Sequence, residues 1–158
     1  METQTLERGL DTSTEECLYE TDFYQWSLKT AELIRQGRFA ELDIENIAEE
    51  IESLGKNNKR ELSSRLVVLI MHLLKWQHQP KRRSKSWKTT INTQRVELEL
   101  LFKQSPSLKY AIDDVIEYSF EKAKLLFEDE TNISKKALPE SCPYSFEQLY
   151  DYYFMPNG

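Results

Sequence analysis

The chain has 158 residues, of which 30% are charged, and its formal net charge is −6. A chain of this length can bury one core without a metal or disulfides. Only four glycines and five prolines, among many charged helix formers, exclude a disordered or sheet-rich protein and favour a helical one.

The cysteines and the apolar runs limit where the protein can act. Cys17 and Cys142 are far apart and fit neither a CxxC pattern nor zinc-ligand spacing, which favours a reducing compartment. The longest apolar stretch, Leu66 to Leu74, is well short of the ~18 residues that a membrane span needs. We therefore expect a cytoplasmic protein that is neither exported nor embedded in a membrane.

Residues 1–18 are polar and lack helical spacing, so we expect a mobile N-terminal segment. The first helix is predicted to begin at Thr21 or Asp22, with Gln25 at the third position of a capping box. Gly37 stands just past its expected end.

Asp43 is placed to cap a second, longer helix. Gly55, followed by Asn58 and Glu61 at capping-box spacing, is a signal for a break in it. The apolar phase instead favours one helix as far as Gln79, because a single row advances by three or four throughout: Leu54, Asn58, Leu62, Leu66, Leu69, Leu73 and Trp76. Both readings stay open, and the phase favours continuity.

Pro80 ends this helix, and Ser84 or Ser86 can cap the next one, which runs to Ser105. Pro106 then opens a helix to about Glu130. After a loop over 131–143, a capping box predicts a short last helix over 146–153. The chain thus predicts an all-α fold, an antiparallel bundle of five or six helices in a single domain over 19–158. The expected core aromatics are Trp26, Trp76 and Trp87.

Charge is distributed unevenly along the chain. Residues 62–96 contain no Asp or Glu and eight Lys or Arg, whereas both flanking regions are acidic. The candidate basic face comprises Lys75, Lys81, Arg82, Arg83, Lys85, Lys88 and Arg95. The candidate acidic face, on one side of the long helix, comprises Glu45, Glu49, Glu50 and Glu52.

Sequence motifs give little support for catalysis. The four glycines stand at positions 9, 37, 55 and 158, so no phosphate-binding loop or nucleophile elbow is present. His72 and His78 have no metal-ligating partner at helical spacing. Glu49 and Glu50 faintly resemble the EExxE motif of helical nucleotide pyrophosphohydrolases, but the third position is Ser53. We assign no catalytic residue, metal ligand or cofactor.

Several stretches, read in order, resemble a bacterial, largely cyanobacterial family catalogued as domain of unknown function 29. They are DFYQW from Asp22, GRFAELDIENIAEEIESLG from Gly37, HLLKWQHQPKRRSKSW from His72, QR at Gln94, PSL at Pro106 and CPYSFEQL from Cys142. The resemblance implies an all-helical fold and carries no established activity.

The sequence therefore predicts a protein-binding or assembly module rather than an enzyme. We expect a two-fold homodimer through the region from Asp43 to Arg83, with the acidic face of each subunit against the basic face of the other. The other way to pair the two faces is within one chain, which leaves a monomer. The alternative is a nucleic-acid-binding protein that uses the basic segment from Lys75 to Arg95. A magnesium-dependent nucleotide hydrolase is the third candidate. Nothing in the sequence identifies the partner.

Overall fold

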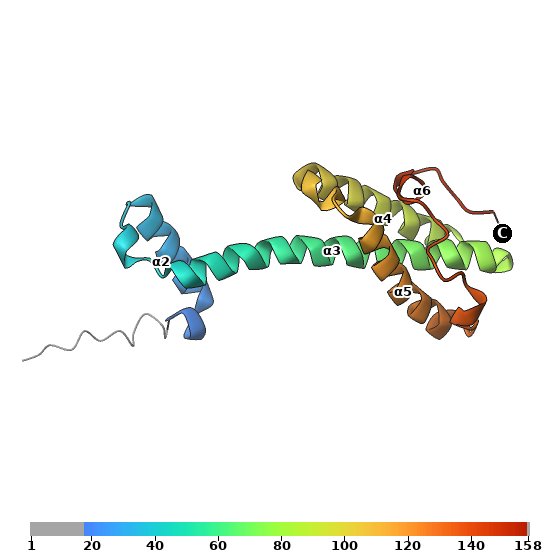
Figure 1. The fold of residues 1–158 in the computed structure, drawn as a ribbon, viewed down its shortest axis with the longest axis horizontal. Helices are drawn as coiled ribbons and strands as arrows, with labels where there is room; N and C mark the ends of the chain where they lie inside the picture. Colours follow the sequence, from blue (N-terminus) through green and yellow to red (C-terminus); the bar gives the residue numbers. More distant parts are fainter. Residues whose placement is uncertain (1–17, 158) are drawn as a thin grey trace, which may run out of the picture. The chain divides into compact units, whose positions relative to one another are not determined.

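The computed structural model of the protein describes residues 18–157, and these contain helices and turns but no strand. The chain divides into two compact units, Met1–Ser53 and Leu54–Gly158 (Figure 1). The predicted all-α helical bundle is confirmed. The expected mobile segment over 1–18 lies outside the described residues except for Leu18, which is helical.

The N-terminal unit contains α2 (Phe23–Arg35), the short 3-10 helix η1 (Phe39–Glu41) and the first turns of α3. The predicted cap is present, because Asp22 Oδ1 accepts a hydrogen bond from the Gln25 backbone N–H at 3.0 Å. Gly37 follows the helix with a φ of 71°, a left-handed conformation in which glycine avoids the strain of a side chain.

A single helix, α3 (Ile44–His78), supplies residues to both units. Asp43 caps it, with its Oδ1 accepting from the Asn46 backbone N–H at 3.3 Å. The helix does not break at Gly55, so the continuity predicted from the apolar phase is confirmed. Apart from the adjacent backbone of its own helix, a Cβ added at Gly55 would meet no atom within 4 Å.

The C-terminal unit packs three further helices with the rest of α3. These are α4 (Lys85–Gln104), α5 (Ile112–Thr131) and α6 (Phe146–Tyr150), with 3-10 turns η2 (Pro80–Arg82), η3 (Pro106–Lys109) and η4 (Lys135–Ala137) between them. The helix predicted from Pro106 to Glu130 is interrupted, because Ala111 takes a left-handed φ of 55° before α5 begins.

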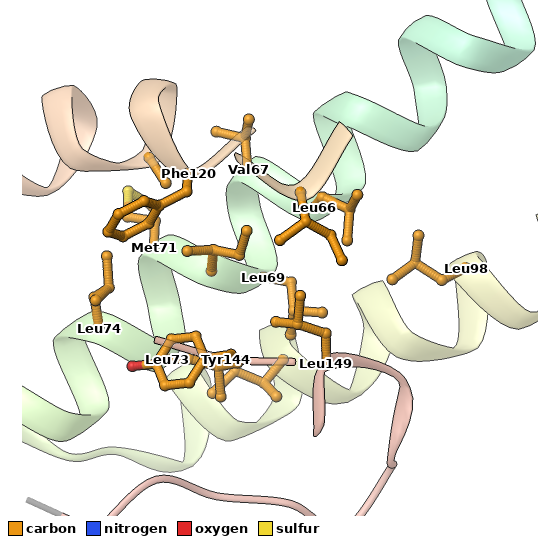
Figure 2. Close-up of a cluster of buried hydrophobic side chains, with 14 of the residues drawn as sticks. Leu66, Val67, Leu69, Met71, Leu73, Leu74, Leu98, Phe120, Tyr144 and Leu149 are labelled. Carbon is orange, nitrogen blue, oxygen red and sulfur yellow. The ribbon is translucent and has the colours of Figure 1, made fainter. Parts of the chain in front are cut away.

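The core of this unit is built on one face of α3. Leu62, Leu69 and Leu73 are fully buried there, and Figure 2 shows Leu69 and Leu73 among residues from α4, α5 and the C-terminal segment. Phe120 from α5 and Leu149 from α6 are also fully buried. The helical spacing of the leucines explains the packing, because residues three and four apart share one face.

The capping box at the start of α6 forms as predicted. Ser145 Oγ accepts from the Gln148 backbone N–H at 3.2 Å, and the Gln148 side chain accepts from the Ser145 N–H at 3.0 Å. The helix is shorter than the expected 146–153, however, since it ends at Tyr150.

Two further expectations concern the whole chain. None of the helices among the described residues is both long and apolar enough to cross a membrane. The single helical domain expected over 19–158 stays a prediction beside the two compact units.

We expect Gly55→Ala to stabilise the protein by ~0.5 to 1 kcal/mol, because alanine is the better residue inside a helix and open space surrounds this position. Gly37→Ala is the matched control and should destabilise, because its φ is positive. Urea unfolding followed by circular dichroism measures both changes. A loss of stability at Gly55 would contradict the continuous helix.

Candidate functional site

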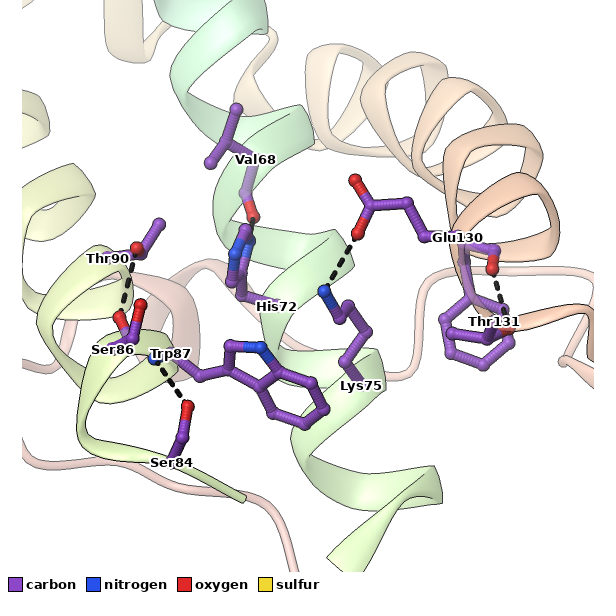
Figure 3. Close-up of polar contacts among 10 residues, drawn as sticks. Val68, His72, Lys75, Ser84, Ser86, Trp87, Thr90, Glu130 and Thr131 are labelled. Carbon is purple, nitrogen blue, oxygen red and sulfur yellow. Dashed lines mark hydrogen bonds and ion pairs between the residues drawn. The ribbon is translucent and has the colours of Figure 1, made fainter. Parts of the chain in front are cut away.

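Four cations of the predicted basic face lie exposed at η2 and the first turns of α4. They are Lys81, Arg82, Lys85 and Lys88. None of them forms an ion pair with a described residue of the C-terminal unit. These four cationic side chains are therefore available to a partner. The first turn of α4 is fixed by Ser84, which caps the helix by accepting from the Trp87 backbone N–H at 3.2 Å (Figure 3).

Lys75 differs from these exposed cations, because it contacts both a carboxylate and the ring of Trp87. The ammonium of Lys75 lies 2.8 Å from Glu130 Oε2 and 4.6 Å from the centre of the Trp87 ring (Figure 3). This cation is thus neutralised within the fold, and it covers one face of the indole. Trp87 is half-buried rather than in the core, where the sequence placed it.

Arg83 and Trp76 repeat this arrangement. Arg83 Nε donates to the Trp76 carbonyl oxygen at 2.8 Å, and the guanidinium carbon lies 5.1 Å from the Trp76 ring centre. Trp76 is also half-buried, so of the three predicted core aromatics Trp26 alone is buried. One face of each indole is therefore covered by a cation and is closed to stacking.

Arg95 does not belong to the basic face, because it is only 2% exposed. Its guanidinium donates to the carbonyl oxygens of Gln148 and Leu149 in α6 at 3.1 and 3.0 Å, and to those of Tyr152 and Phe154 at 3.3 and 2.8 Å. Burial lowers the pKa of Arg95 to about 10, which leaves it positively charged at neutral pH. The side chain therefore holds the C-terminal segment against α4.

The burial of Arg95 could have been predicted from its position in the sequence. It stands four residues after Ile91 and three before Leu98, in phase with a buried row of α4. A cation in an apolar row is buried only when its donors find acceptors. The last carbonyl oxygens of a short helix and those just after it provide such acceptors, because no N–H group of the helix pairs with them.

The predicted acidic face lies in the first turns of α3, within the N-terminal unit. Glu45, Glu49 and Glu52 are exposed, and neither Glu45 nor Glu49 forms an ion pair with a described residue of this unit. Glu50 is half-buried and accepts a hydrogen bond from the Tyr19 hydroxyl at 2.5 Å. This bond to a carboxylate raises the pKa of Tyr19 to about 12.

Apolar side chains accompany these glutamates. Ile44 is 60% exposed and Ile51 is 64% exposed, and Ala48 lies exposed between them. Their spacing of four and three residues places all three on one stripe of α3. We call Ile44, Ala48 and Ile51 the apolar stripe. A glutamate follows each member directly, at positions 45, 49 and 52.

Metal-ligating side chains are scattered over the described residues. Among them, no group of three or more His, Cys, Asp and Glu side chains is arranged to hold a metal ion. The His72 ring contacts its own helix, with Nδ1 at 2.8 Å from the Val68 carbonyl oxygen (Figure 3). Burial lowers the pKa of His72.

The fold and these surfaces define a small all-helical protein with an acidic, partly apolar surface in one unit and a basic surface in the other. The family model described as "Domain of unknown function DUF29" matches residues 18–155, and the chain belongs to this family. The resemblance found in the sequence is thus confirmed. Searches of the curated proteins and of the solved structures gave no match.

We expect Arg95→Met to destabilise the C-terminal unit by ~3 kcal/mol or more, because four carbonyl oxygens lose a charged donor in a buried place. Arg82→Met is the matched control, and its loss should stay within ~0.5 kcal/mol because that side chain is exposed. Urea unfolding of both variants measures the difference. Similar small losses would show that the four bonds contribute little.

Proposed function

We propose that this protein is a protein-binding module that assembles with a second copy of itself through its N-terminal unit. One observation carries the proposal. Among the described residues of that unit Trp26 is the only buried hydrophobic side chain, whereas several large ones are more than 40% exposed: Phe23, Tyr24, Leu28, Ile34, Phe39, Ile44 and Ile51.

An apolar surface of this kind is unusual in a protein that acts alone. Monomers expose single hydrophobic side chains, but contiguous apolar patches rimmed by polar groups mark interaction sites. The apolar stripe on α3 is such a patch, since glutamates flank it along its length. Fully burying an isoleucine contributes ~1.5 to 3 kcal/mol, so covering Ile44 and Ile51 would stabilise a complex substantially.

The phase of α3 supports a helical partner. Further along the same helix, Leu62, Leu66 and Leu69 are buried by the helices of their own unit. The apolar stripe continues the same three-and-four spacing, and no comparable cover lies over it in the N-terminal unit. A second copy supplies helices of the required kind, and a two-fold pair buries both stripes at once.

The two cysteines, without disulfide spacing, support a cytoplasmic location.

Sedimentation equilibrium at tens of micromolar protein tests this function. We expect the mass of two chains rather than the 18.8 kDa of one. Ile51→Glu should weaken the dimer at least ~100-fold, because each of two copies loses a buried isoleucine. Leu100→Glu is the matched control: Leu100 is 55% exposed on α4, outside this surface, and its variant should remain dimeric. A wild-type mass of 18.8 kDa would reject self-assembly.

Nucleic-acid binding is the second candidate function, and the four exposed cations at η2 and α4 favour it. The net charge of −6 opposes it, since a polyanion would be repelled at long range. The dependence of nucleic-acid binding on salt concentration tests this candidate function. If the candidate holds, fluorescence anisotropy with labelled single-stranded RNA should show binding that weakens with rising salt and is lost in Lys81→Glu/Arg82→Glu. Absent binding, or binding indifferent to this variant, rejects it.

A further inference from the structure

A groove runs along the C-terminal unit between α3 and α5. Two cavities of about 660 and 800 Å³ form it, and they adjoin because both are lined by Arg60, Ser63 and Tyr118. The α3 wall extends from Lys56 to Val68, about three and a half helical turns. The groove is thus long enough to hold a short stretch of helix.

The floor of the groove is apolar. Leu62, Leu108 and Val115 line one cavity, and Val67 and Leu126 line the other. Tyr118 lines both cavities and is 56% exposed, so a large part of this aromatic side chain faces the groove uncovered. Leu62 is already covered by its own unit, but Tyr118 and Leu126 are not, and Leu126 is 42% exposed. A helix that covered these two side chains would gain from the hydrophobic effect.

The rim of the groove is cationic. Lys59 and Arg60 are exposed, and neither forms an ion pair with a described residue of the C-terminal unit. Lys122 lies on the opposite wall, with its ammonium 4.7 Å from the Tyr118 ring centre. Among the described residues that line the two cavities, Asp114 is the only acidic one. The groove therefore favours an apolar helix with acidic flanks.

The first turns of α3 have this chemistry. The apolar stripe presents two isoleucines on one face, and exposed Glu45 and Glu49 flank it. We propose that the α3–α5 groove of one copy receives the apolar stripe of a second copy, with its glutamates against Lys59, Arg60 and Lys122. This inference rests on the proposed function, because it names the surface that the stripe meets in the self-assembled protein.

The basic segment at η2 and α4 is the competing acceptor for the glutamates. It carries exposed cations, but no large hydrophobic side chain from residue 55 to residue 95 is exposed. Exposed ion pairs alone contribute little to affinity, and they set register and partner choice instead. The groove offers both charge and an apolar floor, so it is the better match for a stripe that has both.

Self-assembly through these surfaces is reciprocal. In a two-fold pair each copy contributes one stripe and one groove, so two identical contacts form. This symmetry makes a charge-exchange experiment possible. One variant, Glu45→Lys/Glu49→Lys, reverses the stripe, and the other, Lys59→Glu/Arg60→Glu, reverses the groove. In either variant alone, both contacts join like charges.

We expect each variant alone to dimerise at least ~10-fold more weakly than the wild type, because like charges meet in both contacts, and we expect their equimolar mixture to dimerise again. The mixture recovers because a reversed groove meets a reversed stripe in one contact and the wild-type pair forms in the other. Sedimentation equilibrium of each sample measures this, and circular dichroism checks that each variant stays helical. Lys81→Glu/Arg82→Glu is the matched control, with two reversed cations outside the groove, and it should remain dimeric.

The outcomes separate this inference from the proposed function. A monomeric wild type overturns both. If Ile51→Glu separates the copies but the groove variant dimerises like the wild type, self-assembly holds and the groove is not the acceptor. If the mixture stays monomeric, the stripe and groove are not partners. If instead Lys81→Glu/Arg82→Glu is monomeric and recovers on mixing with the stripe variant, the glutamates meet the basic segment, which overturns the groove.

Discussion

The apolar face of α3 is the constraint on which the C-terminal unit depends. Its leucines recur at three- and four-residue spacing, and α4, α5 and α6 each bury side chains against them. A helix with such a face is stable in water only where other elements cover it. The short connections after α3 supply this cover locally, since Pro80 ends the helix and Ser84 starts the next one.

The surroundings of the cations described above divide them into three groups with different physical roles. Arg95 gives up hydration for carbonyl oxygens, and its planar fork reaches four of them in a way that a lysine cannot. Lys75 and Arg83 lie over indole rings, where the aromatic face stabilises the positive charge. The cations that remain in water contribute little to folding and are the ones a partner can use.

Much of the fold was predictable from the sequence, because its signals are local. Asp22, Ser84 and the Ser145 capping box cap helices where the sequence places them, and the apolar phase gave the continuity of α3 through Gly55. The interruption at Ala111 carried no such signal, because alanine there gives no local warning of a left-handed conformation.

The candidate surfaces were less predictable, because they depend on which helices meet. Regional charge counts assigned Lys59 and Arg60 to an acidic part of the chain, although both rim the cationic groove. The same counts assigned Arg95 to an exposed basic face, although tertiary contacts bury it. Summing charge along the chain cannot separate side chains that point to opposite sides of a helix.

The tryptophans are distributed so that fluorescence can follow the two compact units separately. Trp26 is the only indole of the N-terminal unit, and Trp76 and Trp87 belong to the C-terminal unit. Trp26 is buried beside the Tyr19 and Phe23 rings, whereas the other two indoles each lie under a cation. Replacing Trp26 by phenylalanine leaves emission from the C-terminal unit alone. Replacing the other pair isolates the emission of the N-terminal unit, so each unit has its own optical reporter of unfolding.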